Sequence, residues 1–284
     1  MILLTGATGK TGGEIARQLL EKGARLRALV RDEGKAAPLK AAGVELVVGD
    51  IADAGTVRRA LDGITKAFLT LPNGEQQLKQ EKQFVDLAVG AGVKYLVKMS
   101  SMEATANASS PIPRAHWASE EHIRASGLAW TMIKPNFFMQ NLLASAGSIK
   151  GQQRFSLPMG GGTTGMADIR DIAAVIAAVL TGKGHAGQSY EITGPEILTF
   201  HDVADRFSAV LGRRIEYVPM SMDDFRKRMT NILAPWHLDA VCALFQEIAD
   251  VGLDHVTGTF RQLIGREPRP VQQFIRDHMA LFEG

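Results

Sequence analysis

Cysteine is nearly absent from this sequence. The 284 residues include one cysteine, Cys242, which excludes an intrachain disulfide, a CxxC redox pair and a cysteine-rich metal site. Its neighbours are apolar, a setting typical of a buried and inert thiol. The seven histidines show neither HxxxH nor HExxH spacing, so we expect no metal site.

Long apolar runs and a large net charge are missing as well. No stretch approaches the ~18 apolar residues of a membrane span. The apolar run Met1–Leu4 has no basic region before it, so we expect no signal peptide and a cytoplasmic protein. Thirty-two basic residues against thirty acidic ones leave a net charge of +2, which gives no electrostatic footprint for nucleic acid and leaves only a local basic patch open. With 45% hydrophobic and 22% charged residues, the composition is that of a globular chain and excludes disorder.

Short β-rich runs alternate with helical patterns over the first half of the chain. Alternation at this pitch implies crossover connections, and therefore a parallel sheet with helices on both faces. The strands are rich in Val and Leu, as suits a sheet buried on both sides. We predict strands at 2–5, 25–30, 44–48, 66–71, 95–99 and 129–133, and helices at 14–22, 35–42, 53–61, around 84–91 and at 114–125.

The regular alternation of strands and helices ends after residue 150. The pattern there predicts short strands at 165–168, 188–193 and 214–218, helices at 169–180 and 199–211, and a mainly helical remainder. The fold class we expect is α/β, with a doubly wound, Rossmann-like parallel sheet and a smaller C-terminal α/β lobe. We place an NAD(P)-binding domain at 1–150 and a smaller substrate lobe at 151–284, partly interwoven with the first.

A glycine-rich turn at residues 5–13 is the segment most informative about function. It follows the first predicted strand directly and opens the first helix, which is the setting of a dinucleotide-binding turn. Gly6 allows the sharp turn, Gly9 lets the backbone approach a pyrophosphate, and Gly12 lets the helix lie against the sheet. The helix N-terminus adds free N–H groups and the positive end of the helix dipole, both of which suit a phosphate. The alternative interpretation is a glycine-rich turn that binds no ligand. The cofactor-binding residues predicted here are Gly6, Thr8, Gly9, Lys10, Thr11 and Gly12.

The end of the second predicted strand indicates which dinucleotide binds. An NAD site places a carboxylate there for the ribose 2′-hydroxyl, whereas an NADP site tends to place arginine near a 2′-phosphate. This strand ends in Arg31, and Lys35 follows four residues later, so a guanidinium and an ammonium are present for a phosphate. Asp32 could still accept a hydrogen bond from a ribose hydroxyl. Alternatively, Arg31 and Lys35 could simply be solvent-exposed residues at the start of a helix. We therefore favour NADPH over NADH, without excluding NADH.

Together these features resemble the atypical short-chain dehydrogenase family in its NmrA-like branch, which includes quinone reductases, azoreductases and triphenylmethane reductase. The resemblance spans nearly the whole chain. It implies that Asp50 and Ile51 lie near the adenine, and that Leu71 and Pro72 pass the ribose on the nicotinamide side. It also implies that Pro135, Asn136 and Phe137 line the nicotinamide pocket. The matching features are Gly6-Ala7-Thr8-Gly9-x-x-Gly12, Leu29-Val30-Arg31-Asp32, Gly49-Asp50, the run 126–136, Gly184-His185-x-Gly187-x-x-Tyr190, and Pro268-x-Pro270 with Phe274.

The chain departs from the family pattern at the catalytic residues. Short-chain dehydrogenases usually carry a Tyr-x-x-x-Lys pair with the tyrosine as proton donor, and here these positions fall at Ile112 and His116. Ile112 cannot donate a proton, which argues against tyrosine-driven alcohol oxidation or carbonyl reduction. His116 is the candidate catalytic residue, because a histidine can donate or accept a proton near neutral pH. It could also only bond a ribose or lie on the helix surface, and Ser100 could either orient a ribose or be an ordinary loop residue.

Hydride chemistry remains possible without a protein acid. A quinone, an azo bond or a dye cation is already electrophilic and can take hydride from the cofactor while solvent supplies the proton. Phe138, Met139 and Met159 could form a flat apolar pocket for such a small aromatic substrate, or they could simply be core. We therefore expect an NADPH-dependent reductase of quinones, azo compounds or similar acceptors, acting as a monomer or homodimer. The alternatives are a non-catalytic NADP-binding redox sensor that regulates a partner protein and, weakened by Ile112, a sugar-nucleotide or lignan-type reductase.

Overall fold

The computed structural model describes residues 1–283, and the chain divides into two compact units. Unit 1 contains Met1–Asn107, Pro113–Lys134 and Ile172–Glu191, and unit 2 contains Ala108–Ile112, Pro135–Asp171 and the residues from Ile192 onward. The division therefore does not follow a single boundary, and the boundary predicted at residue 150 falls inside unit 2. The segment at 172–191 returns to unit 1 because its helix is apolar on nearly all sides and is fully buried along most of its length.

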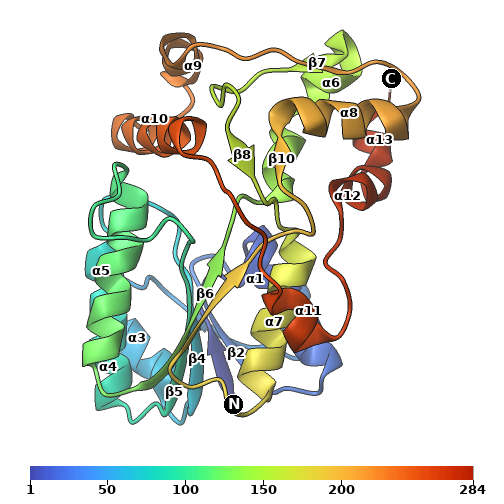
Figure 1. Cartoon of the computed structure of the whole chain (residues 1–284). Coiled ribbons are helices and arrows are strands. Elements are labelled where there is room, and N and C mark those ends of the chain that lie inside the picture. The colour runs from blue at the N-terminus through green and yellow to red at the C-terminus, as the bar shows by residue number, and fades with distance from the viewer. Residues whose placement is uncertain (284) are drawn as a thin grey trace. The chain divides into compact units, whose positions relative to one another are not determined.

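A seven-stranded sheet forms the centre of unit 1, in the order β3-β2-β1-β4-β5-β6-β9 (Figure 1). The pairs from β3 to β6 are all parallel, which confirms the predicted α/β class with a doubly wound, Rossmann-like sheet. The strand order reverses between β1 and β4, which is the point where such sheets bind ligands. The strands are β1 (Ile2–Leu4), β2 (Leu26–Val30), β3 (Glu45–Val48), β4 (Lys66–Leu69), β5 (Tyr95–Met99), β6 (Ala129–Pro135) and β9 (Gln188–Ile192).

Helices cover both faces of this sheet. Figure 1 shows α3, α4 and α5 on one face, and α1 and α7 on the other. A continuous apolar cluster joins the first of these layers to the strands, with Phe84 of α4, Val57 of α3 and Ile123 of α5 all fully buried. Burial on both faces explains why the central strands β1, β4 and β5 are mostly apolar rather than alternating. The helices are α1 (Lys10–Glu21), α2 (Ala37–Ala41), α3 (Ala54–Leu61), α4 (Gln77–Gly90), α5 (Pro111–Ala125) and α7 (Ile169–Thr181).

Several elements differ from the sequence-based expectations, and three of these differences bear on the architecture. The first helix begins at Lys10 rather than at residue 14, because the glycines of the turn already have helical hydrogen bonding. The strand predicted at 165–168 is instead the two-residue strand Thr163–Thr164. The strand predicted at 188–193 lies in the range expected for the C-terminal lobe, but as β9 it forms one edge of the main sheet.

Unit 2 has a core of its own, which is rich in aromatic side chains. Phe155, Phe200, Phe207, Phe274 and Phe282 are each at most 1% exposed and belong to one cluster. Two small two-stranded sheets and several helices surround that cluster. The elements are η1 (Met139–Ser145), α6 (Ala146–Gln152), β7 (Arg154–Phe155), β8 (Thr163–Thr164), β10 (Leu198–Thr199), α8 (Phe200–Leu211), β11 (Glu216–Tyr217), α9 (Met222–Met229), α10 (Pro235–Asp250), α11 (Thr259–Ile264), α12 (Val271–Asp277) and α13 (Met279–Phe282).

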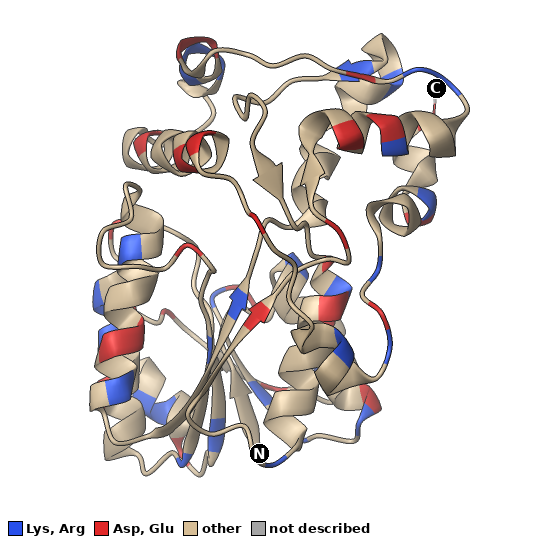
Figure 2. Ribbon diagram, in the orientation of Figure 1, with Lys and Arg blue, Asp and Glu red and all other residues tan. Residues whose placement is uncertain are grey.

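Charged residues of both signs are mixed along the helices of unit 1, as Figure 2 shows. This distribution agrees with the small net charge of the chain. Cys242 is buried on α10, and burial raises the pKa of its thiol, as expected for an inert cysteine. Within residues 1–283, no helix combines the length and apolarity needed to cross a membrane.

Candidate functional site

The predicted cofactor residues of unit 1 follow the carboxyl ends of its parallel strands. Gly6 comes just after β1, Arg31 after β2, Asp50 after β3, Leu71 after β4 and Ser100 after β5. Because parallel strands in one sheet end at the same edge, the fold brings these five segments, which are distant in sequence, to a single edge.

The glycine-rich turn has the close backbone packing that its sequence predicts. Gly6 lies in the left-handed region with φ of +65°, which favours glycine. A Cβ on Gly12 would lie 2.1 Å from the carbonyl oxygen of Gly6, so only glycine fits there. A Cβ on Gly9 would meet only that same oxygen, at 3.3 Å, and the Gly9 backbone is extended. Gly12 is therefore required by the fold, whereas Gly9 leaves a surface that another backbone or a ligand can approach.

The N-terminus of α1 carries hydrogen-bond donors that no side chain caps. Gly9 is the N-cap residue, and it has no side chain to bond the first N–H groups of the helix. The first turn contains no acidic residue, and Thr8, Gly9 and Lys10 are exposed. Free N–H groups and the positive end of the helix dipole suit a pyrophosphate. The turn therefore fits the phosphates of a dinucleotide.

After β2, the acidic side chains have partners within their own loop, whereas two of the basic side chains do not. The carboxylate of Asp32 accepts a hydrogen bond from the backbone N–H of Lys35 at 3.1 Å, and Glu33 forms an ion pair with Lys40 at 2.7 Å. Both acids thus have local partners. Arg31 and Lys35 are exposed, and within residues 1–283 neither side chain forms an ion pair. Two cations are therefore available at the position where a ribose 2′-phosphate would be recognised.

The segments after β3 and β4 are ordered by hydrogen bonds and packing. The exposed Asp50 accepts a hydrogen bond from Ala52 N–H at 2.8 Å, and Gln83 donates to the carbonyl of Ile51 at 3.2 Å. Ile51 and Leu71 both pack partly against the apolar cluster of unit 1, while Pro72 is exposed. These four residues flank the glycine turn on both sides in the strand order.

Ser100 forms a hydrogen bond with a buried carboxylate. Its hydroxyl donates to Oε1 of Glu120 on α5 at 2.5 Å, and both residues are buried. Glu120 also pairs with Arg124 at 2.8 Å. Because its only proton is used, the Ser100 hydroxyl can act toward a ribose only as an acceptor.

His116 lies one turn earlier on α5 than Glu120 and is 8% exposed. Its Nδ1 is 3.1 Å from Nζ of Lys98, the last residue but one of β5, which is itself fully buried. Lys98 also pairs with the buried carboxylate of Glu81 on α4 at 2.9 Å. Burial holds the pKa of His116 well below its usual value of 6.5, and the positive charges of Lys98 and Lys134 lower it further. His116 is therefore a neutral imidazole near pH 7.

Pro135, Asn136 and Phe137 belong to unit 2. Asn136 is buried, and its side-chain oxygen accepts hydrogen bonds from the Thr164 hydroxyl at 2.7 Å and the Gly165 N–H at 3.0 Å. Asn136 thus orders the loop at 164–165. Phe137 is half-buried and packs edge-on against Phe200, with their ring centroids 5.8 Å apart.

The three residues predicted to contact substrate also lie in unit 2. Phe138 is half-buried and pairs with Ala167 through a β-bridge. Met139 and Met159 are 0% exposed and belong to the aromatic core of unit 2. They therefore stabilise unit 2 through packing in its core. Their contact with a substrate stays a prediction.

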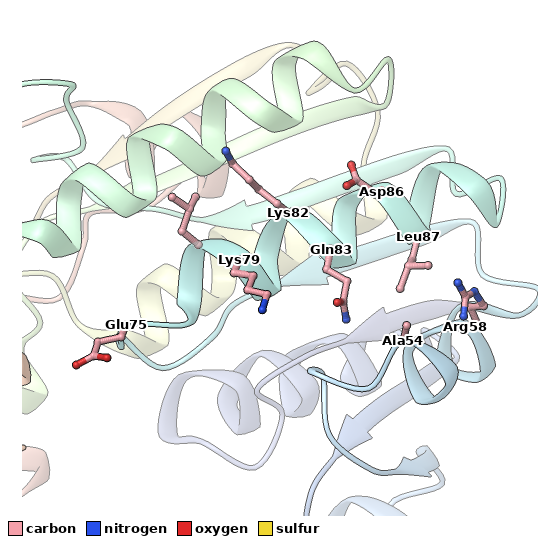
Figure 3. A pocket seen from close by; sticks show the side chains of 9 residues that line it. Ala54, Arg58, Glu75, Lys79, Lys82, Gln83, Asp86 and Leu87 are labelled. Carbon is pink, nitrogen blue, oxygen red and sulfur yellow. The ribbon is translucent and has the colours of Figure 1, made fainter.

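A surface pocket between α3 and α4 contains none of these predicted residues (Figure 3). Its lining mixes acidic and basic side chains, and Gln83 reaches from it to the carbonyl of Ile51. The lining residues are Ala54, Arg58, Glu75, Leu78, Lys79, Lys82, Gln83, Asp86 and Leu87.

Sequence reasoning missed Lys98, Glu81 and Glu120. A signal for the first two was present: Lys98 interrupts an apolar strand, and Glu81 shares the helical spacing of Phe84 and Ala88. A charged residue at a core position in each of two neighbouring elements indicates a buried pair.

Comparisons with known proteins identify the family of this chain. The model of the NmrA-like family matches residues 1–275. The chain is 36% identical over 285 residues to the NAD(P)H azoreductase of Xenophilus azovorans, with 99% of each chain covered. It is 29% identical over 241 residues to quinone oxidoreductase 2 of Escherichia coli strain K12, with 83% of each chain covered.

A solved structure is similar along nearly its whole length. It is the NADPH-dependent quinone oxidoreductase of Escherichia coli in complex with NADPH, with a TM-score of 0.89, 26% identity, and coverage of 98% of this chain and 100% of the other. The resemblance inferred from the sequence motifs is thereby confirmed. The chain belongs to the NmrA-like family and is an NAD(P)H-dependent oxidoreductase.

Proposed function

We propose that this protein is an NADPH-dependent reductase that transfers hydride to a quinone, an azo compound or a similar electrophilic aromatic acceptor. The observation that carries the proposal is the pair of residues at the family's catalytic positions. Ile112 stands where the tyrosine acid would be, and His116 is a neutral imidazole in a buried setting. A site without a strong acid favours acceptors that need none.

The glycine turn and the end of β2 would hold the cofactor. The uncapped N–H groups of α1 suit the pyrophosphate, and the open surface at Gly9 allows close approach. Arg31 and Lys35 would bind the 2′-phosphate, because the competing carboxylate of Asp32 is turned toward the backbone of its own loop. This arrangement supports a preference for NADPH over NADH.

The remaining predicted residues would complete the site. Asp50 and Ile51 would face the adenine, Leu71 and Pro72 would pass the second ribose, and Ser100 would accept a hydrogen bond from it. In unit 2, the segment Pro135–Phe137 would border the nicotinamide. The half-buried Phe138 would offer an apolar surface to an aromatic ring, whereas the fully buried Met139 and Met159 would act only through packing.

Bound NADPH supplies the hydride in this chemistry. Reduction of a quinone to a hydroquinone takes one hydride and one proton, and water can provide that proton. The role of His116 would be to donate one hydrogen bond from its neutral ring, which orients a bound group without transferring charge. The chain's contribution is then mainly binding, orientation and exclusion of water.

A panel of acceptors tests the proposal. NADPH oxidation would be followed with menadione, with an azo dye and, as one control, with an aliphatic ketone. As a second control, NADP+ reduction would be followed with a secondary alcohol. We expect turnover with menadione or the dye and none with the controls, and a higher kcat/KM with NADPH than with NADH. Reduction of the ketone but not of menadione would contradict the proposal, and equal kcat/KM for the two cofactors would contradict the role of Arg31 and Lys35.

A further inference from the structure

A fully buried cation lies next to the candidate catalytic histidine. Nζ of Lys98 is surrounded by three hydrogen-bond partners: Oε1 of Glu81 at 2.9 Å, the carbonyl oxygen of Met99 at 2.5 Å, and Nδ1 of His116 at 3.1 Å. Lys98 and Glu81 are both 0% exposed. An ammonium group has three donors, and each of these has one partner.

The direction of the bond to His116 follows from this arrangement. A charged lysine has no lone pair, so it cannot accept a hydrogen bond. With the carboxylate of Glu81 beside it, the ammonium form is the one that the pair stabilises. Nδ1 of His116 must then be the acceptor, and the single ring proton must lie on Nε2.

We propose that Lys98, held by Glu81, is a positioning residue that fixes His116 as the neutral tautomer with its proton on Nε2. Nδ1 of His116 is bound to Lys98, and Nε2 of His116 is left as a hydrogen-bond donor. The effect of this donor on turnover rests on the proposed function, but the tautomer itself does not.

The other charged groups near the histidine are consistent with this role. Lys134 on β6 also disfavours a charged ring, and it lies 3.7 Å from the carboxylate of Glu120 on α5. Gln77 donates to the same oxygen of Glu81 that Lys98 binds, at 3.2 Å. A buried ion pair costs desolvation unless its members are well hydrogen-bonded. Two donors share Oε1 of Glu81, while its Oε2 is buried with no hydrogen-bond partner among residues 1–283.

The tautomer can be read directly by nitrogen NMR. The full chain labelled with 15N-histidine would be recorded with and without NADP+, and the signals of His116 would be assigned from the spectrum of His116→Gln. We expect a pyridine-like Nδ1 and a pyrrole-like Nε2, unchanged from pH 8 to pH 6. A proton on Nδ1, or a charged ring in that range, would overturn the proposal.

The double variant Lys98→Met with Glu81→Leu removes both charges together, so that no unpaired charge is left buried. We expect its His116 to show a mixture of the two tautomers. A single Nε2–H tautomer as in the parent chain would mean that Lys98 does not set it, and would also overturn the proposal.

A double-mutant cycle separates positioning from general stabilisation. We expect the Lys98→Met/Glu81→Leu change to lower kcat/KM about three- to tenfold in the parent chain, the value of one hydrogen bond. In a His116→Ala background, which has no side-chain acceptor for Lys98, the same change should cost less than about twofold, because its effect passes through His116. Equal losses in both backgrounds would overturn the positioning role. If no acceptor is turned over at all, the proposed function fails while the NMR result still decides the tautomer.

Discussion

Replacing His116 by alanine distinguishes a proton donor from a group that only orients. The substitution removes a buried ring and the acceptor of the hydrogen bond from Lys98. A buried donor left without a partner costs about 1–3 kcal/mol of stability. We therefore expect a lower melting temperature for His116→Ala, and His116→Gln is the matched control because its side-chain oxygen can still accept from Lys98.

The expected effect on turnover follows from the protonation state. Burial and two nearby cations keep the pKa of His116 well below 6.5, so the imidazolium that would serve as an acid is scarce at pH 7. A neutral ring can contribute one hydrogen bond, worth about 0.5–1.5 kcal/mol. We therefore predict a fall in kcat of less than about tenfold, roughly 1.4 kcal/mol of barrier. A positioned general acid would contribute ~10²–10⁴-fold.

The assay is steady-state NADPH oxidation with menadione, together with a separate titration of NADPH binding. Both should be run on the parent chain and on the two His116 variants at pH 7. A loss in kcat of a hundredfold or more in a folded variant, with unchanged NADPH binding, would refute this reasoning. It would identify His116 as the proton donor.

Three further outcomes follow from the structure. Arg31→Ala should raise the Kd for NADPH about tenfold or more while changing the Kd for NADH less than about twofold, because a charge-assisted contact to phosphate is lost; equal losses would remove the 2′-phosphate assignment. Gly9→Val should abolish NADPH binding with little change in melting temperature, whereas Gly12→Ala should destabilise the fold by about 1–3 kcal/mol or more, since its Cβ would overlap the backbone of Gly6; normal NADPH affinity in a folded Gly9→Val would contradict the binding mode. Finally, the lowered pKa of His116 means that the unfolded chain takes up its proton first, so stability should decrease as pH falls below about 6.5, by up to about 1.4 kcal/mol per pH unit. Denaturant unfolding of His116→Gln should show a smaller slope in that range, and an identical slope would show that His116 is charged in the folded chain.

The sheet and the glycine turn could be predicted because their determinants are local. Apolar runs mark the strands, and the spacing of Gly6, Gly9 and Gly12 between a strand and a helix has few structural solutions. The same holds for Arg31, which follows its strand directly. The start of α1 was misplaced because glycine is a poor helix former, and here packing against the sheet overrides that preference.

The rest depends on contacts between distant segments. Nothing near β9 in the sequence indicates that it joins the edge of the main sheet rather than the C-terminal lobe, because that pairing is made with β6. The Lys98–Glu81 pair joins a strand to the preceding helix through two residues that are 17 positions apart. The environment of His116 depends on that pair, so its neutral state could not be inferred from α5 alone.

The most direct test of the account is a single turnover of menadione with a stoichiometric amount of NADPH under anaerobic conditions. The parent chain is expected to convert one NADPH and one quinone to NADP+ and hydroquinone, at a rate that His116→Ala lowers less than about tenfold. Gly9→Val is expected to give no reaction above the rate without protein. Failure of the parent chain to oxidise NADPH with menadione or with any azo or dye acceptor would contradict the account.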